Sequence, residues 1–189
     1  MVGIIKLLAR FIAFIHCYFY VVLVIIGVKY KTVSILTSRW SGYYGIVLRQ
    51  AFYKKTLNKC GGNLKVFFGS YICYRSVVIG DNCTIEEFCV ISNCSIGNDV
   101  IIAANVSLMS GKNHHDVDLL DKTFYETQSE VIERIKIGNN IWIGTHSVIM
   151  ANIADGTVIG AGSVLNKNID EENMIFAGVP AKFIRARGC

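Results

Sequence analysis

Apolar residues form one long block near the start of the chain. The run from Phe11 to Gly27 is almost uninterrupted, and His16 is its one polar break. A membrane-spanning helix needs about 20 apolar residues, so this run is close to the required length. Residues 1–31 therefore predict an apolar helical segment that spans a membrane, lies on its surface, or packs into a subunit contact. Membrane contact is the interpretation we favour.

Aromatic and basic side chains alternate in the next segment, residues 32–65. This mixture is typical of a helix at the level of lipid headgroups, and equally of an amphipathic helix packed on a following domain. We therefore expect a helical, aromatic–basic connector. Its marker residues are Trp40, Tyr43, Tyr44, Phe52 and Tyr53, with Arg39, Arg49, Lys54 and Lys55.

From Val66 onward, aliphatic residues recur every six positions. A small residue often follows each of them, and a small or β-branched residue often stands four positions later. Three six-residue edges make one triangular coil, in which the aliphatic side chains point inward and stack on the next coil. Residues 66–187 therefore predict a mainly β solenoid of parallel strands. The aliphatic series are Ile79–Ile85–Ile91, Ile96–Ile102–Leu108, Ile137–Ile143–Ile149 and Ile153–Ile159–Leu165.

One polar insertion interrupts the repeat, at residues 109–136. It begins with Ser110 and carries the adjacent histidines His114 and His115. A long loop that projects from a regular solenoid is usually functional or disordered. The paired histidines favour a functional loop.

Composition argues against a nucleic-acid partner and a structural zinc site, and it indicates anionic ligands. The net charge is +5, and no run of five or more Lys or Arg occurs, which argues against a nucleic-acid partner. The seven cysteines show no C-x2-C spacing, which argues against a structural zinc site. The basic groups Lys29–Lys31 and Arg49–Lys59 fit anionic lipid, whereas Lys182–Arg187 fits a phosphate-bearing ligand.

Three motifs in order carry a family resemblance. The runs Ile137–His146, Val158–Val164 and Ala177–Arg185 resemble those of the bacterial hexapeptide O-acetyltransferases. That family includes the maltose and galactoside acetyltransferases and the O-acetyltransferases of surface polysaccharides, and the resemblance covers roughly residues 60–187. It implies a left-handed parallel β-helix, a homotrimer with active sites between subunits, and acetyl-CoA as the acyl donor.

The resemblance also implies that a histidine of the projecting loop is the general base. A sugar hydroxyl is a poor nucleophile near neutral pH, so an imidazole must take its proton as the new bond forms. We favour His115, which precedes Asp116, and His114 is the runner-up. Asp116 or Asp118 would orient the imidazole by accepting its other N–H. His146 is expected to have a structural or ligand-lining role.

The family's cofactor contacts map onto a corner of the coil and onto the C-terminal region. Backbone N–H groups at the glycine corner would stabilise the oxyanion, while lysine and arginine would meet phosphate charge. Trp142 is expected to border the acceptor. Cys89 is also expected to line the acceptor, and because the galactoside enzymes carry a sugar-contacting Asn at its position, the acceptor would bind differently here. The expected cofactor-binding residues are Gly144, Thr145, Ala161, Asn166, Lys167, Lys182 and Arg185.

One spacing departs from the family pattern, because the stretch from Ile149 to Ala154 is about two residues short. An irregular coil edge is expected there. Two other functions remain open from the residues alone. A γ-type carbonic anhydrase would need three zinc-binding histidines, and only His114, His115 and His146 lie outside the apolar N-terminal run. A β-helical scaffold would leave the polar loop and the C-terminal motif unexplained.

The sequence therefore predicts an acetyl-CoA-dependent O-acetyltransferase without a metal cofactor. Its expected acceptor is a sugar hydroxyl of a cell-surface polysaccharide or of its lipid-linked precursor. Acetyl-CoA is a cytoplasmic metabolite, and the first 31 residues favour a membrane. We therefore expect the protein on the cytoplasmic face of the bacterial inner membrane.

Overall fold

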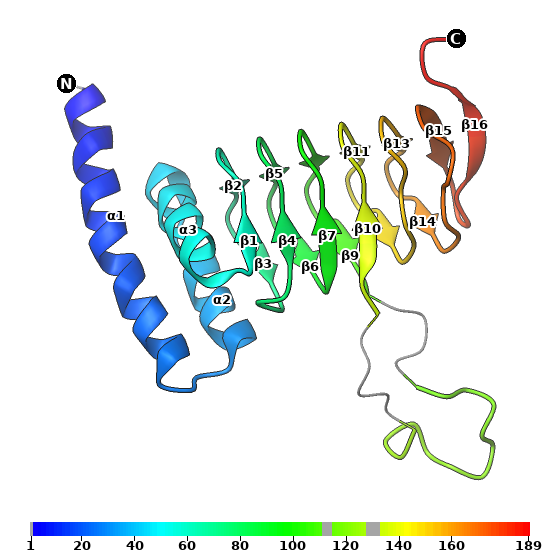
Figure 1. Cartoon of the computed structure of the whole chain (residues 1–189), viewed down its shortest axis with the longest axis horizontal. Helices are drawn as coiled ribbons and strands as arrows, with labels where there is room; N and C mark the ends of the chain where they lie inside the picture. Colours follow the sequence, from blue (N-terminus) through cyan, green and yellow to red (C-terminus); the bar gives the residue numbers. More distant parts are fainter. Residues whose placement is uncertain (1, 111–114, 128–132) are drawn as a thin grey trace.

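The computed structural model describes residues 2–110, 115–127 and 133–189, and its N-terminal part is helical (Figure 1). The outermost helix α1 packs along α3, while α2 and α3 pack against the first strands of the β-domain. The boundary expected after residue 31 falls inside α2, and the expected connector 32–65 ends in strands rather than in a helix. The helices are α1 (Val2–Ile25), α2 (Tyr30–Ser38) and α3 (Gly42–Thr56).

Short parallel strands then wind into three sheets that form the sides of a prism. The sheet orders are β1-β4-β7-β10, β16-β15-β13-β11-β8-β5-β2 and β14-β12-β9-β6-β3, which we name sheets A, B and C. The predicted left-handed parallel β-helix is therefore confirmed. Its strands are β1 (Lys59–Cys60), β2 (Lys65–Val66), β3 (Tyr71–Ile72), β4 (Val78–Ile79), β5 (Thr84–Ile85), β6 (Val90–Ile91), β7 (Cys94–Ile96), β8 (Ile101–Ile102), β9 (Ser107–Leu108), β10 (Ile135–Ile137), β11 (Trp142–Ile143), β12 (Val148–Ile149), β13 (Val158–Ile159), β14 (Val164–Leu165), β15 (Met174–Ala177) and β16 (Lys182–Ala186).

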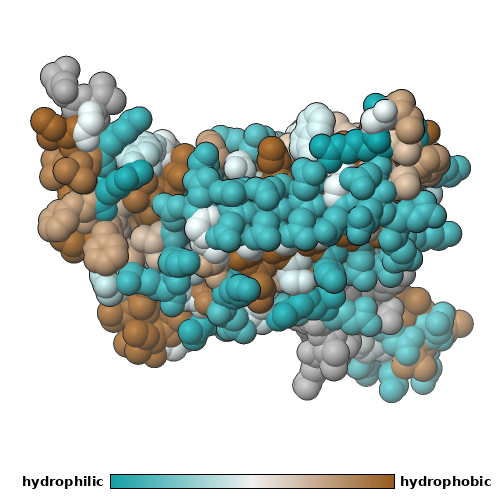
Figure 2. Space-filling view, turned by 45° about the horizontal axis from the view of Figure 1, so that its top comes forward, coloured by the Kyte–Doolittle hydropathy of each residue, from teal (hydrophilic) through white to brown (hydrophobic). Residues whose placement is uncertain are grey.

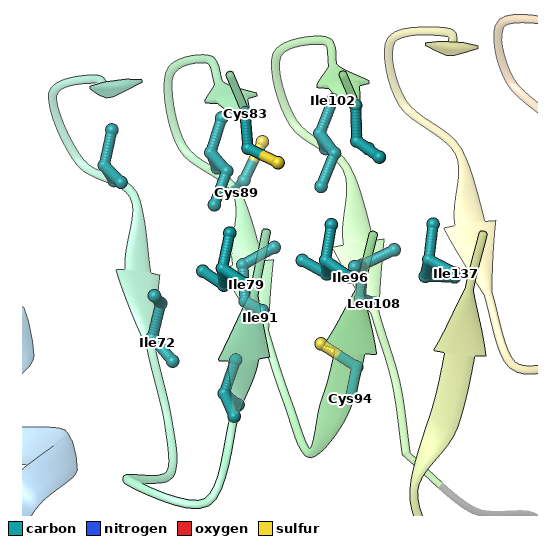
Figure 3. Packing of buried hydrophobic residues seen from close by; sticks show 14 of the residues in the cluster. Ile72, Ile79, Cys83, Cys89, Ile91, Cys94, Ile96, Ile102, Leu108 and Ile137 are labelled. Atoms are coloured by element: carbon teal, nitrogen blue, oxygen red, sulfur yellow. The ribbon is translucent and has the colours of Figure 1, made fainter. Parts of the chain in front are cut away.

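The aliphatic residue of each edge points into the prism, where it stacks on its counterpart in the next coil (Figure 3). Ile79 pairs with Ile96 and Ile96 with Ile137 in sheet A, and all three side chains are buried. Each such side chain contributes about 2 kcal/mol by leaving water. Because one coil alone exposes its core at both ends, this stabilisation builds up only when coils stack.

The small residue after the aliphatic one permits the tight corner. A Cβ atom on Gly80 would lie 2.6 Å from the carbonyl oxygen of Gly97. A Cβ atom on Gly97 would lie equally close, at 2.6 Å, to the carbonyl oxygen of Gly138. The backbones of successive coils thus approach too closely for any side chain, which explains the Ile-Gly pairs of the sequence.

The β-helix departs from the sequence expectation at its start. Its first strand is Lys59–Cys60, before the expected start at Val66. Cys60 pairs with Ile79 and is buried, so a cysteine occupies the inward position that an aliphatic residue holds in later coils. This substitution hides the first coil from a search for aliphatic periodicity.

The short spacing after Ile149 produces the irregular edge that was expected. Where sheet A would continue beyond β10, Ile153 forms single bridges to Ile137 and to Ile169 instead of a strand. The last two strands then leave the coil pattern, because β15 pairs with β16 in the antiparallel sense at the end of sheet B. The C-terminal motif therefore closes the far end of the prism.

Candidate active site

The polar insertion leaves the prism between β9 and β10 and extends away from the coils (Figure 1). His115 lies on it, and its side chain is exposed. The Nδ1 atom of His115 is 2.6 Å from the carbonyl oxygen of Phe124, and the two rings also meet edge to face. The runner-up base, His114, lies outside the described residues.

The contact with Phe124 decides which nitrogen of His115 carries a hydrogen. A carbonyl oxygen can only accept, so the Nδ1 atom must be the donor. In a neutral imidazole the other nitrogen, Nε2, then holds the free lone pair. Nε2 has no hydrogen-bond partner among the described residues. This is the tautomer that a general base requires.

The expected acidic partner of His115 makes a different contact. One carboxylate oxygen of Asp116 accepts the backbone N–H of Asp118 at 3.0 Å, which forms a local turn. The carbonyl of Phe124, rather than either carboxylate, takes the Nδ1 hydrogen of His115. Sequence reasoning could not find Phe124, because its contribution comes from the backbone and depends on the path of the loop.

Three of the expected cofactor-binding residues lie together at one corner of the prism. A Cβ atom on Gly144 would be 2.5 Å from the backbone nitrogen of Ala161, so the two coils touch here. Thr145 donates its hydroxyl hydrogen to the carbonyl oxygen of Ala104 at 2.7 Å. Close backbone approach and small side chains leave this corner open to a ligand.

The two candidate oxyanion donors at this corner differ. The N–H of Gly144 donates to the carbonyl oxygen of Ile159 at 2.8 Å and is therefore used within the coil. The N–H of Thr145 donates to no backbone acceptor in the described part of the chain. Thr145 is thus the better placed of the two to stabilise an oxyanion.

His146 follows at the same corner, with a positive φ of 58°. Its N–H donates to the carbonyl oxygen of Ala104 at 3.1 Å, and its side chain is exposed. The residues at equivalent corners of neighbouring coils, Asn105 and Gly162, also have positive φ. His146 therefore has a backbone role in the corner, while its imidazole faces outward.

The basic candidates lie at the C-terminal end of the prism. Asn166 and Lys167 follow β14, while Lys182 and Arg185 belong to β16, and all four side chains are exposed. The guanidinium of Arg185 donates to the carbonyl oxygen of Cys189 at 2.8 Å. The N–H of Ala181 donates to the carbonyl oxygen of Val164 at 2.8 Å, so the start of β16 lies beside β14.

The two residues expected to line the acceptor lie in opposite environments. Trp142 is 56% exposed on sheet B, so its indole is available to a ligand or to another subunit. Cys89 is fully buried, points into the prism (Figure 3), and donates its thiol hydrogen to the carbonyl oxygen of Ala103 at 3.1 Å. This location argues against an acceptor contact for Cys89, because its side chain does not reach the surface of the chain.

The loop and the corner do not meet within one chain. No hydrogen bond or ring contact joins His115 to Thr145 or Ala161 among the residues that the structure describes. In the same described ranges, no group of three or more His, Cys, Asp or Glu side chains is arranged to hold a metal ion. The base thus lies on the insertion between β9 and β10, and the corner lies between β11 and β12.

Comparison with known proteins gives one family model and several relatives. Residues 76–109 match the model described as bacterial transferase hexapeptide, six repeats. Galactoside O-acetyltransferase of Escherichia coli strain K12 is 34% identical over 148 residues, which is 72% of this chain and 68% of that protein. A second protein of the same organism, named for O-acetyl transfer in lipopolysaccharide biosynthesis, is 29% identical over 58% of this chain and 60% of its own length.

Solved structures agree with these matches. A galactoside acetyltransferase in complex with coenzyme A has a TM-score of 0.67 and 31% identity, and the match covers 82% of this chain and 78% of that one. A maltose O-acetyltransferase from Clostridium difficile 630 has a TM-score of 0.70 at 24% identity, covering 84% and 85%. The second likeness concerns the fold alone.

Proposed function

Because this chain belongs to the hexapeptide-repeat acetyltransferases, we propose that it transfers the acetyl group of acetyl-CoA to a hydroxyl group of a sugar. The observation that carries the proposal is the 34% identity to galactoside O-acetyltransferase, which extends over 148 residues. The solved relative that holds coenzyme A supports the donor. The tautomer of His115 supports the chemistry.

In the proposed reaction, the acceptor hydroxyl gives its proton to Nε2 of His115 while its oxygen attacks the thioester carbonyl carbon. The bond from Nδ1 to the carbonyl of Phe124 stabilises the imidazolium that forms. The carbonyl oxygen becomes an oxyanion near the N–H of Thr145. Collapse breaks the carbon–sulfur bond, and the thiolate of CoA takes the proton back from the imidazolium.

The proposed donor site runs from the open corner to the C-terminal end of the prism. The small side chain of Ala161, next to Gly144 and Thr145, would allow the pantetheine arm to lie against the backbone. Lys167 and Lys182 are exposed cations that suit the phosphates. Arg185 would join them by exchanging its bond to the carbonyl of Cys189 for a phosphate oxygen.

Because loop and corner lie apart in one chain, we propose that each active site forms between two subunits of a homotrimer. The loop of one subunit would bring His115 to the corner of its neighbour. Two apolar side chains on sheet B, Ile101 and Trp142, are 47% and 56% exposed. Their exposure supports a subunit interface on this sheet. A cyclic trimer would provide three identical sites.

The proposed acceptor is a sugar of a cell-surface polysaccharide or of its lipid-linked precursor, at the cytoplasmic face of the inner membrane. Similarity to a protein named for lipopolysaccharide O-acetyl transfer supports the class of acceptor. The membrane contact is supported by α1, whose segment Gly3–Ile25 has a mean hydropathy of 2.1 with only 17% of its most apolar window buried.

Mass spectrometry of the surface glycan tests the acceptor. Glycan from cells that make the protein should carry acetyl increments that disappear when the gene is deleted. They should return with the wild-type gene but not with a gene encoding His115→Ala. Identical glycan masses in all four strains would overturn the proposed acceptor. Acetyl transfer itself is tested separately, with the purified protein and free sugars.

A further inference from the structure

Charge is divided unequally between the two halves of the molecule. The first acidic residue of the sequence is Asp81, and the preceding 80 residues contain 11 of the 19 Lys and Arg residues. Residues 1–80 therefore carry +11, and the rest of the chain carries −6. The modest net charge of +5 conceals this contrast. The helical end is a surface suited to an anionic partner.

The same end of the molecule exposes apolar side chains. Only one stripe of α1 is buried, at Ala13, Cys17 and Tyr20, while residues such as Ile4 and Leu7 are 74% and 69% exposed. Figure 2 shows hydrophobic residues gathered at this end, beside a coil surface that is mostly hydrophilic. An exposed apolar surface flanked by cations is typical of helices that lie in a membrane interface.

Polar contacts hold α1 against α3 and against the turn that precedes it. Nδ1 of His16 is 2.7 Å from the hydroxyl of Tyr44, and the indole N–H of Trp40 donates to the hydroxyl of Tyr20 at 2.9 Å. These bonds keep α1 alongside α3, so α1 cannot cross a bilayer without carrying the polar residues of α3 with it. An orientation in the plane of the membrane satisfies both the apolar face and the polar contacts.

A groove of about 630 Å³ lies between α1 and α3. Its apolar walls come from Leu7, Phe11 and Phe14 on α1, and from Val47 and Ala51 on α3. The volume falls within the range of about 300–1,000 Å³ typical of small-molecule sites. Such walls suit a hydrocarbon chain.

Three cations also line the groove, and each has a neutral partner. Arg10 donates from Nε to the hydroxyl of Tyr43 at 2.5 Å, and Lys55 donates to the hydroxyl of Tyr18 at 3.0 Å. Lys54 donates to a backbone carbonyl at 2.6 Å. No carboxylate occurs in the first 80 residues, so these charges are not neutralised from within the helical end. An anion beside the groove would supply the missing charge.

We propose that this groove seats an acyl chain of an anionic phospholipid, with the lipid phosphate held by Arg10, Lys54 and Lys55. Helix α1 then lies in the membrane interface beside the bound lipid. The proposal rests on the membrane contact proposed above and adds a defined lipid site to it. It does not depend on acetyl transfer.

Calorimetric titration of the purified full-length protein, without acetyl-CoA, tests the site. The probe is dihexanoyl-phosphatidylglycerol at concentrations where it remains monomeric. We expect saturable binding of one lipid per chain. Dihexanoyl-phosphatidylcholine should bind at least tenfold more weakly, and glycerophosphoglycerol, which lacks acyl chains, should not bind. Equal binding of all three probes, or no binding of the first, would overturn the proposal.

Variants separate the groove from general surface charge. Arg10→Gln with Lys55→Gln should weaken binding by roughly 25-fold, from about fivefold per cation. The matched control, Lys59→Gln with Lys65→Gln, removes the same charge from two exposed strand positions and should change binding less than threefold. A similar loss in both double variants would mean that the lipid responds to overall charge rather than to the groove.

A bulky side chain in the groove tests the acyl seat directly. Ala51→Trp should weaken binding at least tenfold by filling the space between the helices. Val47→Trp provides a second filling variant, and circular dichroism shows which of the two retains the wild-type fold. Unchanged lipid binding in a folded filling variant would overturn the proposal.

Discussion

Cys89 carries a thiol that is fully buried in the coil and bonded to the carbonyl oxygen of Ala103, 3.1 Å away. Burial raises the pKa of this thiol from 9.0 to about 11. The thiol of Cys94 is also fully buried, and burial raises its pKa to about 12. Neutral thiols of this kind act as small apolar residues of the core rather than as nucleophiles.

Raised thiol pKa values make the stability of the fold sensitive to alkaline pH. Between pH 9 and 11 the thiol of Cys89 ionises in the unfolded chain but stays protonated in the folded one. The free energy of unfolding therefore decreases as pH rises through this window. At pH 10 the decrease caused by this residue is about 1 kcal/mol. Urea titrations at pH 8 and pH 10 should show a larger loss for the wild type than for Cys89→Ala. Equal losses would contradict the burial argument.

Sequence reasoning proposed some residues of the candidate site and could not propose others. His115 and the corner at Thr145 followed from the family resemblance, because their motifs are local in sequence. The contact of His115 with Phe124 was out of reach, because it depends on where the loop folds back. The burial of Cys89 was not anticipated, because alignment with a sugar-contacting Asn placed this residue at the acceptor.

Arg49 joins the helical end to the first coil. It is fully buried, and its guanidinium donates to the carbonyl oxygens of Val66 at 2.8 Å, Thr37 at 3.0 Å and Trp40 at 2.7 Å. Two of these acceptors lie at or just beyond the C-terminal end of α2, where a positive charge also meets the helix dipole. Burial lowers the pKa of Arg49 to about 10, so it remains charged at neutral pH.

Replacement of Arg49 should therefore loosen the junction between these elements. Arg49→Met removes these three hydrogen bonds from a buried site, and we expect a loss of about 3 kcal/mol in the free energy of unfolding. The control Arg39→Met alters an exposed arginine at the C-terminal end of α2 and should cost less than about 0.5 kcal/mol. Thermal unfolding followed by circular dichroism measures both. A small effect of Arg49→Met would show that the junction does not depend on this side chain.

The elements were predictable where the repeat is regular. The coils were predicted from four aliphatic series with Ile-Gly pairs. Each edge requires an aliphatic side chain that points inward, followed by a small residue that permits the tight corner. The first coil was missed because Cys60 replaces the aliphatic residue there. The helices of the second segment followed from their aromatic and basic pattern, but the division at Trp40 carries no strong sequence marker. The role of Arg49 was hidden because arginine usually marks a surface.

The whole molecule joins a charged helical end to a regular β-helix, with the proposed base on the insertion between β9 and β10 and the corner between β11 and β12. The contrast between +11 and −6 was present in the sequence, in the absence of acidic residues before Asp81. The net charge of the whole chain does not reveal this contrast, because it adds the charges regardless of their position in the sequence. The proposed homotrimer, in contrast, followed from the family resemblance alone, because one chain supplies only part of each proposed site.

Mixed assemblies test whether subunits share the active site. His115→Ala inactivates the loop of a subunit, and Ala161→Trp blocks its corner. Coexpression of the two variants should restore about a quarter of wild-type activity, because about one interface in four then joins an intact loop to an intact corner. Each variant alone should be inactive, and sedimentation should give three times the mass of the chain. No recovery in an assembled mixture would place the whole site within one chain.

The most direct test of the central claim is the rate of acetyl transfer from acetyl-CoA to sugar acceptors by the purified protein. The wild type should release CoA thiol and form a monoacetylated sugar in equal amounts. His115→Ala should lower the rate by about two orders of magnitude or more, whereas His114→Ala should retain most of it. Wild-type rates in His115→Ala, or thiol release without acetylated sugar, would contradict the account.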